Sequence, residues 1–400
     1  MRLMRLETLA SVALVLVTAA AVSAPCVRSF SRAAAVFARM AHLEGRVASA
    51  LEHEREEVSV EMTTVPSRHG NLRARVFIPA HIRRAVTLVA GVNMLGIEEP
   101  RLYGLAYQLA SVGVAVVTPD TPDLKRFDIT ARTTDMIEDS ALWLSRQPRL
   151  TRDGHIGMFG ISFSGGLSVI AAGRPSLRPL VDVVFSFGGH GDFPRVLRFL
   201  CTGNEPALEP LAAPASGSSP PEVVYRRPHD YGVVIILLDL ADRLVPAEQV
   251  VPLRTAILKY LLAGHYELID KRLAAVTFDD ATALAAALPE PSRTYMRRVN
   301  ERDVDTLGRL VAPLLPSLGT DPDLSPERSA APICPVYIIH GTDDTVIPSI
   351  ETLRMERYLQ GRTPVRVLLS GLITHAELDR QLDLGEAWKL VDFFAALLRQ

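Results

Sequence analysis

The sequence predicts an α/β fold built on a mostly parallel sheet that is flanked by helices. Short apolar runs alternate with segments of helical periodicity along residues 58–205, and strand-like runs return after residue 330. Two of the runs, residues 86–92 and 114–117, are apolar nearly throughout, which is typical of strands buried on both faces of a sheet. Because parallel strands need crossover segments between them, the alternation indicates helices on both faces.

The expected elements follow one another in a regular order. The alternating residues 58–63 and the run at 72–78 predict a hairpin, since the segment between them is rich in turn residues. The later strands are expected at residues 86–92, 114–117, 155–159, 180–187, 336–340 and 365–369. Helical spacing occurs at residues 102–109, 137–144 and 384–398. These segments account for the sheet and the helices that cover it.

Residues 206–329 interrupt the alternation. Five prolines fall within residues 206–221 and predict a linker. The patterns after the linker are mostly helical, for example at residues 251–262 and 281–288. We therefore expect one α/β core, formed by residues 58–205 and 330–400, with a helical cap inserted between the sixth and seventh core strands.

Residues 1–27 are expected to be a signal peptide or an N-terminal membrane anchor. Arg2 and Arg5 precede twenty residues, 8–27, that carry no charge and include small residues suited to cleavage. A stretch of this length is also long enough to span a bilayer. We expect the body to be exported or anchored on the periplasmic or extracellular side. A cytoplasmic orientation stays open because arginines follow the stretch, within a helical lead-in at residues 28–57.

Charge and cysteine content argue against several classes of protein. A net charge of −2 and a pI near 6.6 give no electrostatic reason to expect a nucleic-acid partner. The three cysteines are too few for a disulfide framework, and Cys201 and Cys334 are expected to be separate buried thiols. The cysteine spacing suggests no metal site, so neither a metal nor another cofactor is expected.

A serine-centred turn is the strongest functional signal. Residues 160–166 read Gly-Ile-Ser-Phe-Ser-Gly-Gly and stand between a strand-like run and a helix-like segment. A serine at the apex of such a turn projects its hydroxyl group from the end of the sheet, and small neighbours leave room for the tight turn. The pattern resembles the nucleophile elbow G-x-S-x-G around Ser162, with Ser164 in place of the last glycine. A plain tight turn or a phosphate cradle would use the same small residues.

Carboxylates and a histidine follow the last two expected strands. Asp343 and Asp344 come after residues 336–340, and His375 comes after residues 365–369. Catalytic groups of open parallel sheets gather at the carboxyl ends of the strands. An imidazole within hydrogen-bond reach of Ser162 would take its proton, and a carboxylate would fix the imidazole's tautomer.

With Ser162, Asp344 and His375 in this order, the chain resembles the α/β-hydrolase superfamily, of the serine esterase or dienelactone-hydrolase-like kind. The resemblance covers about residues 58–205 and 330–400. The family's H-G-x-x-D pattern puts the triad acid at Asp344. Asp343 is an adjacent alternative, and Asp192 is a second one, since some members take their acid after the preceding strand.

The resemblance also implies an oxyanion hole made of backbone N–H groups. Phe163, the residue after the nucleophile, supplies one donor, and the loop after the strand at 86–92 supplies the other. We expect Val92 to be that second donor, with Asn93 as the alternative. Many members have His-Gly in this loop where this chain has Ala90 and Gly91. His190 is an alternative base, and His340 is expected to be structural.

The expected function is hydrolysis of a carboxylic ester through an acyl-enzyme. The helical cap predicts a sheltered small-molecule acyl substrate of mostly apolar character. An acyltransferase, a thioesterase or a peptidase with the same triad stays open. A non-catalytic binding protein of this fold also stays open, because Ser164 replaces a glycine and the oxyanion-loop histidine is missing.

Overall fold

The computed structural model describes most of the chain outside its N-terminal segment. The described residues are 26–41, 49, 51–206, 208, 223–267, 269–374, 377–378 and 384–400. The predicted signal peptide or anchor lies almost entirely outside them. Among the described residues no helix combines the length and apolar character needed to cross a membrane.

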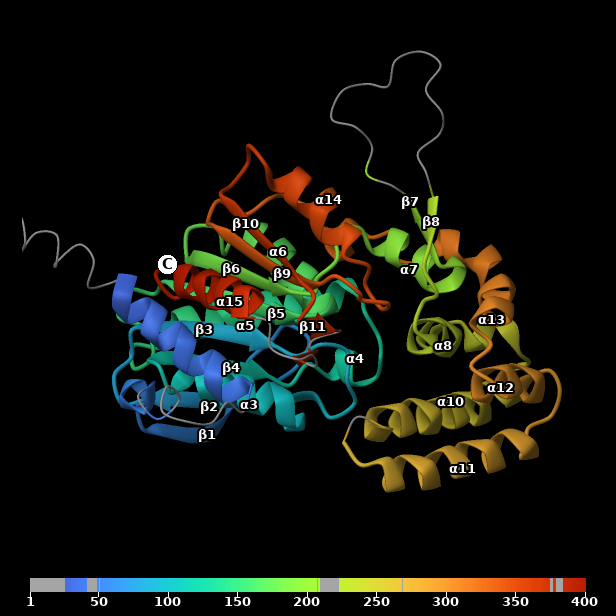
Figure 1. Ribbon diagram of the computed structural model, residues 1–400. Coiled ribbons are helices and arrows are strands. Elements are labelled where there is room, and N and C mark those ends of the chain that lie inside the picture. The colour runs from blue at the N-terminus through green and yellow to red at the C-terminus, as the bar shows by residue number, and fades with distance from the viewer. Residues whose placement is uncertain are drawn as a thin grey trace, which may run out of the picture.

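Eight strands form one sheet in the order β1-β2-β4-β3-β5-β6-β9-β10 (Figure 1). Their bounds are β1 Val58–Val65, β2 Leu72–Pro79, β3 Arg84–Val89, β4 Val114–Pro119, β5 Ile156–Ile161, β6 Val181–Phe187, β9 Val336–Gly341 and β10 Val365–Ser370. Only β2 runs antiparallel to its neighbours β1 and β4. This strand order is that of the α/β-hydrolase sheet, so the predicted fold class is confirmed.

The helices and minor strands connect and cover this sheet. A first helix spans residues 26–40. The others before the insertion are α3 Pro100–Ala110, α4 Pro122–Lys125, α5 Ala131–Ser145, α6 Phe163–Gly173 and α7 Phe193–Thr202. The last two are α14 Ile350–Leu359 and α15 Leu384–Leu397. Two small antiparallel pairs are β7 Asn204–Pro206 with β8 Val223–Tyr225, and β11 Ile373–Thr374 with β12 Glu377–Leu378.

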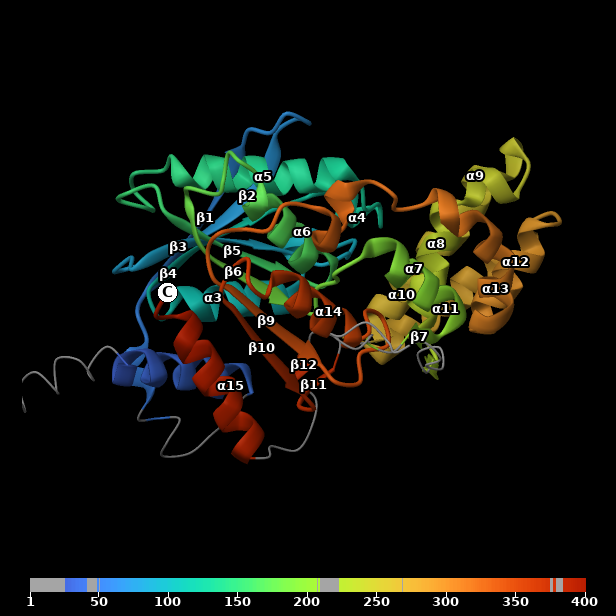
Figure 2. The same cartoon turned by 90° about the horizontal axis from the view of Figure 1, so that it is seen from above.

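Two hydrophobic cores lie on opposite faces of the sheet. Along β3, Ala85 and Val89 pack into one core, whereas Val86 and Leu88 pack into the other, as the alternation of a strand requires. Helices α5 and α6 cover the first face, and α3, α15 and the helix at 26–40 cover the second (Figure 2). The central strands β3, β4, β5, β6 and β9 are therefore buried on both sides, which explains their unbroken apolar runs.

In the described part of the segment between β8 and β9, six α-helices group on one side of the sheet (Figure 1), and three short 3-10 helices follow them in the chain. They are α8 Asp230–Asp239, α9 Ala241–Leu244, α10 Ala247–Glu267, α11 Lys271–Ala287, α12 Ser292–Asn300 and α13 Val304–Val311. We call these six helices, together with His229 at the N-cap of α8 and the turns between the helices, the insertion. The apolar run at residues 233–238 lies in α8, which packs against α7, α10 and α13.

Three local expectations are refined. The strand expected at 86–92 is β3 and ends at Val89, because the chain must turn where Gly91 lies against Ser162. The helical lead-in at 28–57 consists of the helix at 26–40 and a 3-10 turn at Glu52–Glu54, followed by non-helical residues. Cys201 and Cys334 are buried free thiols, and burial raises the pKa of each to about 12.

Candidate active site

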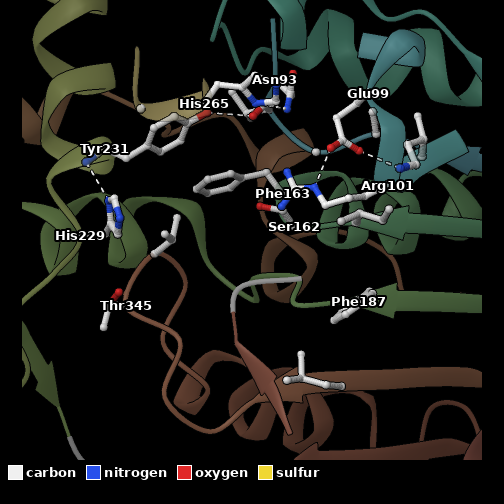
Figure 3. Close-up of a pocket in the computed structure, with 18 of the residues that line it drawn as sticks. Asn93, Glu99, Arg101, Ser162, Phe163, Phe187, His229, Tyr231, His265 and Thr345 are labelled. Carbon is white, nitrogen blue, oxygen red and sulfur yellow. Dashed lines mark hydrogen bonds and ion pairs between the residues drawn. The ribbon is translucent and has the colours of Figure 1, made fainter. Parts of the chain in front are cut away.

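Ser162 occupies a strained turn between β5 and α6. Its φ is 57° and its ψ is −134°, a combination that residues with a Cβ rarely adopt. Two backbone hydrogen bonds hold it there: its N–H donates to the Phe187 carbonyl at 2.7 Å, and its carbonyl accepts from the Gly165 N–H at 2.8 Å. The turn projects the Ser162 side chain from the end of the sheet into a cavity (Figure 3).

The glycines of the motif are needed because the turn is closely packed. A Cβ at Gly160 would lie 2.3 Å from the Ser164 carbonyl oxygen, and one at Gly166 would lie 2.6 Å from Nδ1 of His190. A Cβ at Gly91 would lie 3.2 Å from the Cβ of Ser162. The loop after β3 therefore lies directly against the Ser162 side chain.

Ser164, which replaces the usual last glycine, is completely buried and fulfils a structural task. Its Oγ accepts a hydrogen bond from the Ile161 N–H at 2.9 Å. The same Oγ lies 2.9 Å from the Val89 carbonyl and 2.7 Å from the Ile161 carbonyl, and its single proton serves these two acceptors. The side chain thus ties β5 to β3 and does not face the cavity.

Asp344 is buried and held by its own loop. Its Oδ1 accepts from the N–H groups of Val346 at 2.8 Å and Ile347 at 3.0 Å. Its Oδ2 lies 3.2 Å from Nε2 of His340. Backbone donors that point at one oxygen fix the orientation of a carboxylate, which is what the acid of a triad needs.

His340 is placed as a structural residue. Its Nδ1 lies 2.6 Å from the Thr352 hydroxyl, and its Nε2 lies 2.8 Å from the Ile347 carbonyl. The carbonyl can only accept, so Nε2 carries the proton and Nδ1 accepts from Thr352. The ring is completely buried and supports the Asp344 loop from behind.

The alternative acids occupy other environments. Asp343 has a half-exposed side chain, 3.9 Å from Nη1 of Arg226, at the rim of the cavity. Asp192 caps α7 by accepting from the Arg195 N–H at 2.9 Å, and it pairs with Nε of Arg328 at 2.6 Å. One oxygen of the Asp192 carboxylate therefore caps the helix, and the other forms the ion pair with Arg328.

His190, the alternative base, lies beneath α6. Its Nε2 donates to the Leu324 carbonyl at 2.7 Å, and the rings of Phe163 and Phe193 flank it. Complete burial lowers the pKa of His190 to about 4. The favoured base, His375, lies outside the described residues.

The cavity at Ser162 has a volume of about 580 Å³. The two predicted oxyanion donors, Phe163 and Val92, and the alternative Asn93 all line it. Phe163 is the first residue of α6, so its N–H has no partner within the helix. Within the described ranges no group of three or more His, Cys, Asp or Glu side chains could hold a metal ion.

Three hydrogen bonds join the insertion to the loops around Ser162. The hydroxyl of Tyr231 donates to the Val92 carbonyl at 2.8 Å. The His229 N–H donates to the Thr345 carbonyl at 2.9 Å, in the loop that carries Asp344. Asn93 donates through Nδ2 to Nδ1 of His265 at 3.3 Å (Figure 3). Sequence reasoning assigned no partners to these insertion residues. The only local signal is the polar triplet at 229–231, which spans the N-cap and the first two residues of the apolar helix α8.

A charged cluster forms the wall of the cavity on the insertion side. Burial disfavours the charge of Asp230, but hydrogen bonds from His229 and Tyr260 and the nearby Arg302 outweigh it and hold the pKa of Asp230 at about 2. Arg302 also pairs with Glu267 at 2.9 Å. The cluster therefore places a carboxylate, a hydroxyl and a guanidinium group in the lining of the same cavity as Ser162.

The solved structures that are similar to this chain resemble it only distantly. No protein-family model and no curated protein matches the chain. Among solved structures, the esterase domain of a Rhodothermus marinus protein is similar at 13% identity and a TM-score of 0.41, over 85% of this chain and 98% of that one. A Pyrobaculum calidifontis esterase is similar at 15% identity and a TM-score of 0.44, over 92% and 90%. A dienelactone hydrolase from Anabaena variabilis is similar at 14% identity and a TM-score of 0.41, over 85% and 96%. Because these identities and TM-scores are low, the assignment of the fold rests on the order of the strands in the sheet.

Proposed function

We propose that the chain is a serine hydrolase that cleaves a carboxylic ester through an acyl-enzyme, with Ser162 as the nucleophile. The observation that carries the proposal is the backbone of Ser162, which is held at a φ of 57° between β5 and α6 at the wall of the cavity. Strain of this kind persists only where surrounding contacts impose it, and it is typical of functional sites. The elbow places a hydroxyl group where a sheltered substrate can meet it.

The proposed reaction uses the residues in the following roles. His375 takes the proton of the Ser162 hydroxyl while Oγ attacks the ester carbonyl, and the N–H groups of Phe163 and Val92 receive the oxyanion. The imidazolium then protonates the leaving alcohol. Water then gives a proton to His375 and attacks the acyl carbon. The bond between that carbon and Oγ of Ser162 breaks, the imidazolium returns its proton to Oγ, and the carboxylic acid leaves.

We assign the supporting carboxylate to Asp344. Burial and two backbone N–H donors favour it over Asp343, which is half exposed, and over Asp192, which caps a helix and pairs with an arginine. Because Asp344 follows β9 and Ser162 follows β5, both lie at the carboxyl edge of the same parallel sheet. Transfer of the acyl group to an alcohol or amine would use the same residues, and product analysis with competing acceptors separates it from hydrolysis.

The test is covalent labelling with a fluorophosphonate, which reacts with activated serines, followed by intact-mass measurement. The wild-type protein and Ser164→Ala are expected to gain one adduct, and Ser162→Ala is expected to gain none. Ser164→Ala is the matched control, because it removes a hydroxyl from the same turn. Folded wild-type protein that gains no adduct, or an adduct that persists in Ser162→Ala, would contradict the proposal.

A further inference from the structure

The cavity at Ser162 has two chemically different ends. Apolar side chains from three helices and one strand form the first end: Phe37, Met40, Leu105, Phe187, Leu390 and Phe394. Polar and charged side chains of the insertion and the segments beside it form the second end: His229, Asp230, Tyr260, Glu267 and Arg302. We call these the apolar end and the polar end. The cavity is also lined by the ion pair of Glu99 with Arg101 at the start of α3 and, on the insertion side, by the apolar Leu261 and Phe278.

The apolar end depends on the helix at residues 26–40. This helix is fastened to the body by polar contacts, since Arg39 donates through Nη1 to the Ser111 hydroxyl at 2.8 Å and Ser31 donates to Oε1 of Glu54 at 2.9 Å. Its Phe37 side chain is only 8% exposed and belongs to the same core as α3 and α15. The helix is therefore a fixed wall of the cavity.

Ser162 lies between the two ends. On one side, its N–H bonds the carbonyl of Phe187, a residue of the apolar end. On the other side, Gly91 packs against the Ser162 side chain, and Tyr231 of the insertion bonds the next residue in that loop, Val92. A substrate whose reacting carbon is at Ser162 can thus extend in both directions.

We propose that the substrate is an amphipathic ester whose acyl chain occupies the apolar end, against the helix at 26–40, and whose alcohol portion occupies the polar end. This assignment rests on the proposed function of Ser162. Its physical reason is the difference in desolvation: an alkyl chain gains free energy on leaving water, whereas a polar alcohol loses it unless hydrogen-bonding groups receive it. The two ends therefore orient the ester about the serine.

The acyl-chain assignment is tested by binding, so that it does not depend on catalysis. The assay uses full-length Ser162→Ala protein with a fluorescent fatty acid bound. Four methyl esters, the butanoate, hexanoate, octanoate and decanoate, are added as competitors, and the displacement of the fatty acid gives the affinity of each ester. The affinity is expected to rise with chain length by roughly fourfold for each buried methylene. Adding Met40→Trp, which fills the apolar end, is expected to remove most of this rise.

Val27→Trp is the matched control, because it places the same side chain on the same helix at a position that is 64% exposed. It is expected to leave the rise unchanged. Leu105→Trp on α3 fills the same end of the cavity from another helix. It replaces Met40→Trp in the experiment if circular dichroism shows that Met40→Trp does not fold. An affinity that does not depend on chain length, or filling variants that behave like Val27→Trp, would overturn the proposal. Failure of the fluorophosphonate labelling with a normal rise in affinity would instead refute the proposed catalysis and keep the binding site.

Discussion

The hydrogen bond from Tyr231 to the Val92 carbonyl makes a testable link between the insertion and the proposed oxyanion hole. Tyr231→Phe removes only the hydroxyl group, which donates at 2.8 Å. The bond joins two neutral groups, so it contributes about 1 kcal/mol to the free energy that holds the loop at Val92 in place. If that energy holds the loop in the orientation that the transition state needs, kcat is expected to fall about fivefold.

The effect has an upper limit, since complete loss of an oxyanion donor costs about 10²–10³ in kcat. A smaller loss is expected here because Asn93 still anchors the same loop through His265 and through its own bond to the Leu95 N–H at 2.8 Å. The assay is steady-state hydrolysis of a p-nitrophenyl ester, with kcat and KM determined separately. A positioning role lowers kcat and leaves KM nearly unchanged.

Tyr358→Phe is the matched control. It also removes a tyrosine hydroxyl that donates to a backbone carbonyl, that of Ser329, but it lies in α14 and does not line the cavity. Its kcat is expected to equal that of the wild type, while both variants lose a similar amount of stability. Equal kcat values for the two variants, or a loss that appears only in KM, would refute the reasoning.

The remaining predictions concern the turn and its buried neighbours. Ser164→Ala is expected to keep fluorophosphonate labelling but to lose about 1 kcal/mol of stability with its hydrogen bonds, measured by urea unfolding; a stable but unlabelled variant would contradict the structural role. Gly160→Ala is expected to cost about 3 kcal/mol or more, because its Cβ would meet a backbone carbonyl at 2.3 Å. Gly104→Ala in α3, where no atom lies within 4 Å of the added Cβ, is expected to stabilise the protein by about 1 kcal/mol in the same urea unfolding experiment. Burial lowers the pKa of His190 from 6.5 to about 4. Between these two pH values unfolding takes up a proton, so the free energy of unfolding is expected to fall by about 3 kcal/mol in total as the pH drops from 6.5 to about 4. Folded His190→Gln is expected to lack this decline and to keep the fluorophosphonate reaction; a decline that persists in the variant would show that another group causes it.

Much of the architecture could be predicted from local patterns. The apolar runs of β4, β5, β6 and β9 mark strands buried on both faces, and their alternation with helices predicts a parallel sheet. Gly160 indicates the tight turn, because a Cβ there would collide with the backbone of Ser164, four residues later. Such signals are readable because each depends on neighbours along the chain.

The partners of individual side chains were less accessible. A sequence does not tell whether Ser164 faces the cavity or, as the structure has it, bonds Val89 on β3. The choice between Asp343 and Asp344 likewise depends on which carboxylate turns inward to the backbone N–H groups of its own loop. A shift of the loop by one residue would turn Asp343 inward in place of Asp344, and the amino-acid composition of the loop would be the same in both cases.

By itself, therefore, the sequence determined the fold class, the elbow at Ser162 and the helical character of the insertion, since periodicity and steric fit at a turn are local properties. Only the tertiary structure decided what surrounds the serine. Tyr231 reaches Val92 across 139 positions of the chain, and the helix at 26–40 meets α15 from the opposite end of the sequence. These contacts arise because burying apolar faces brings distant segments together, and that packing is a property of the whole chain.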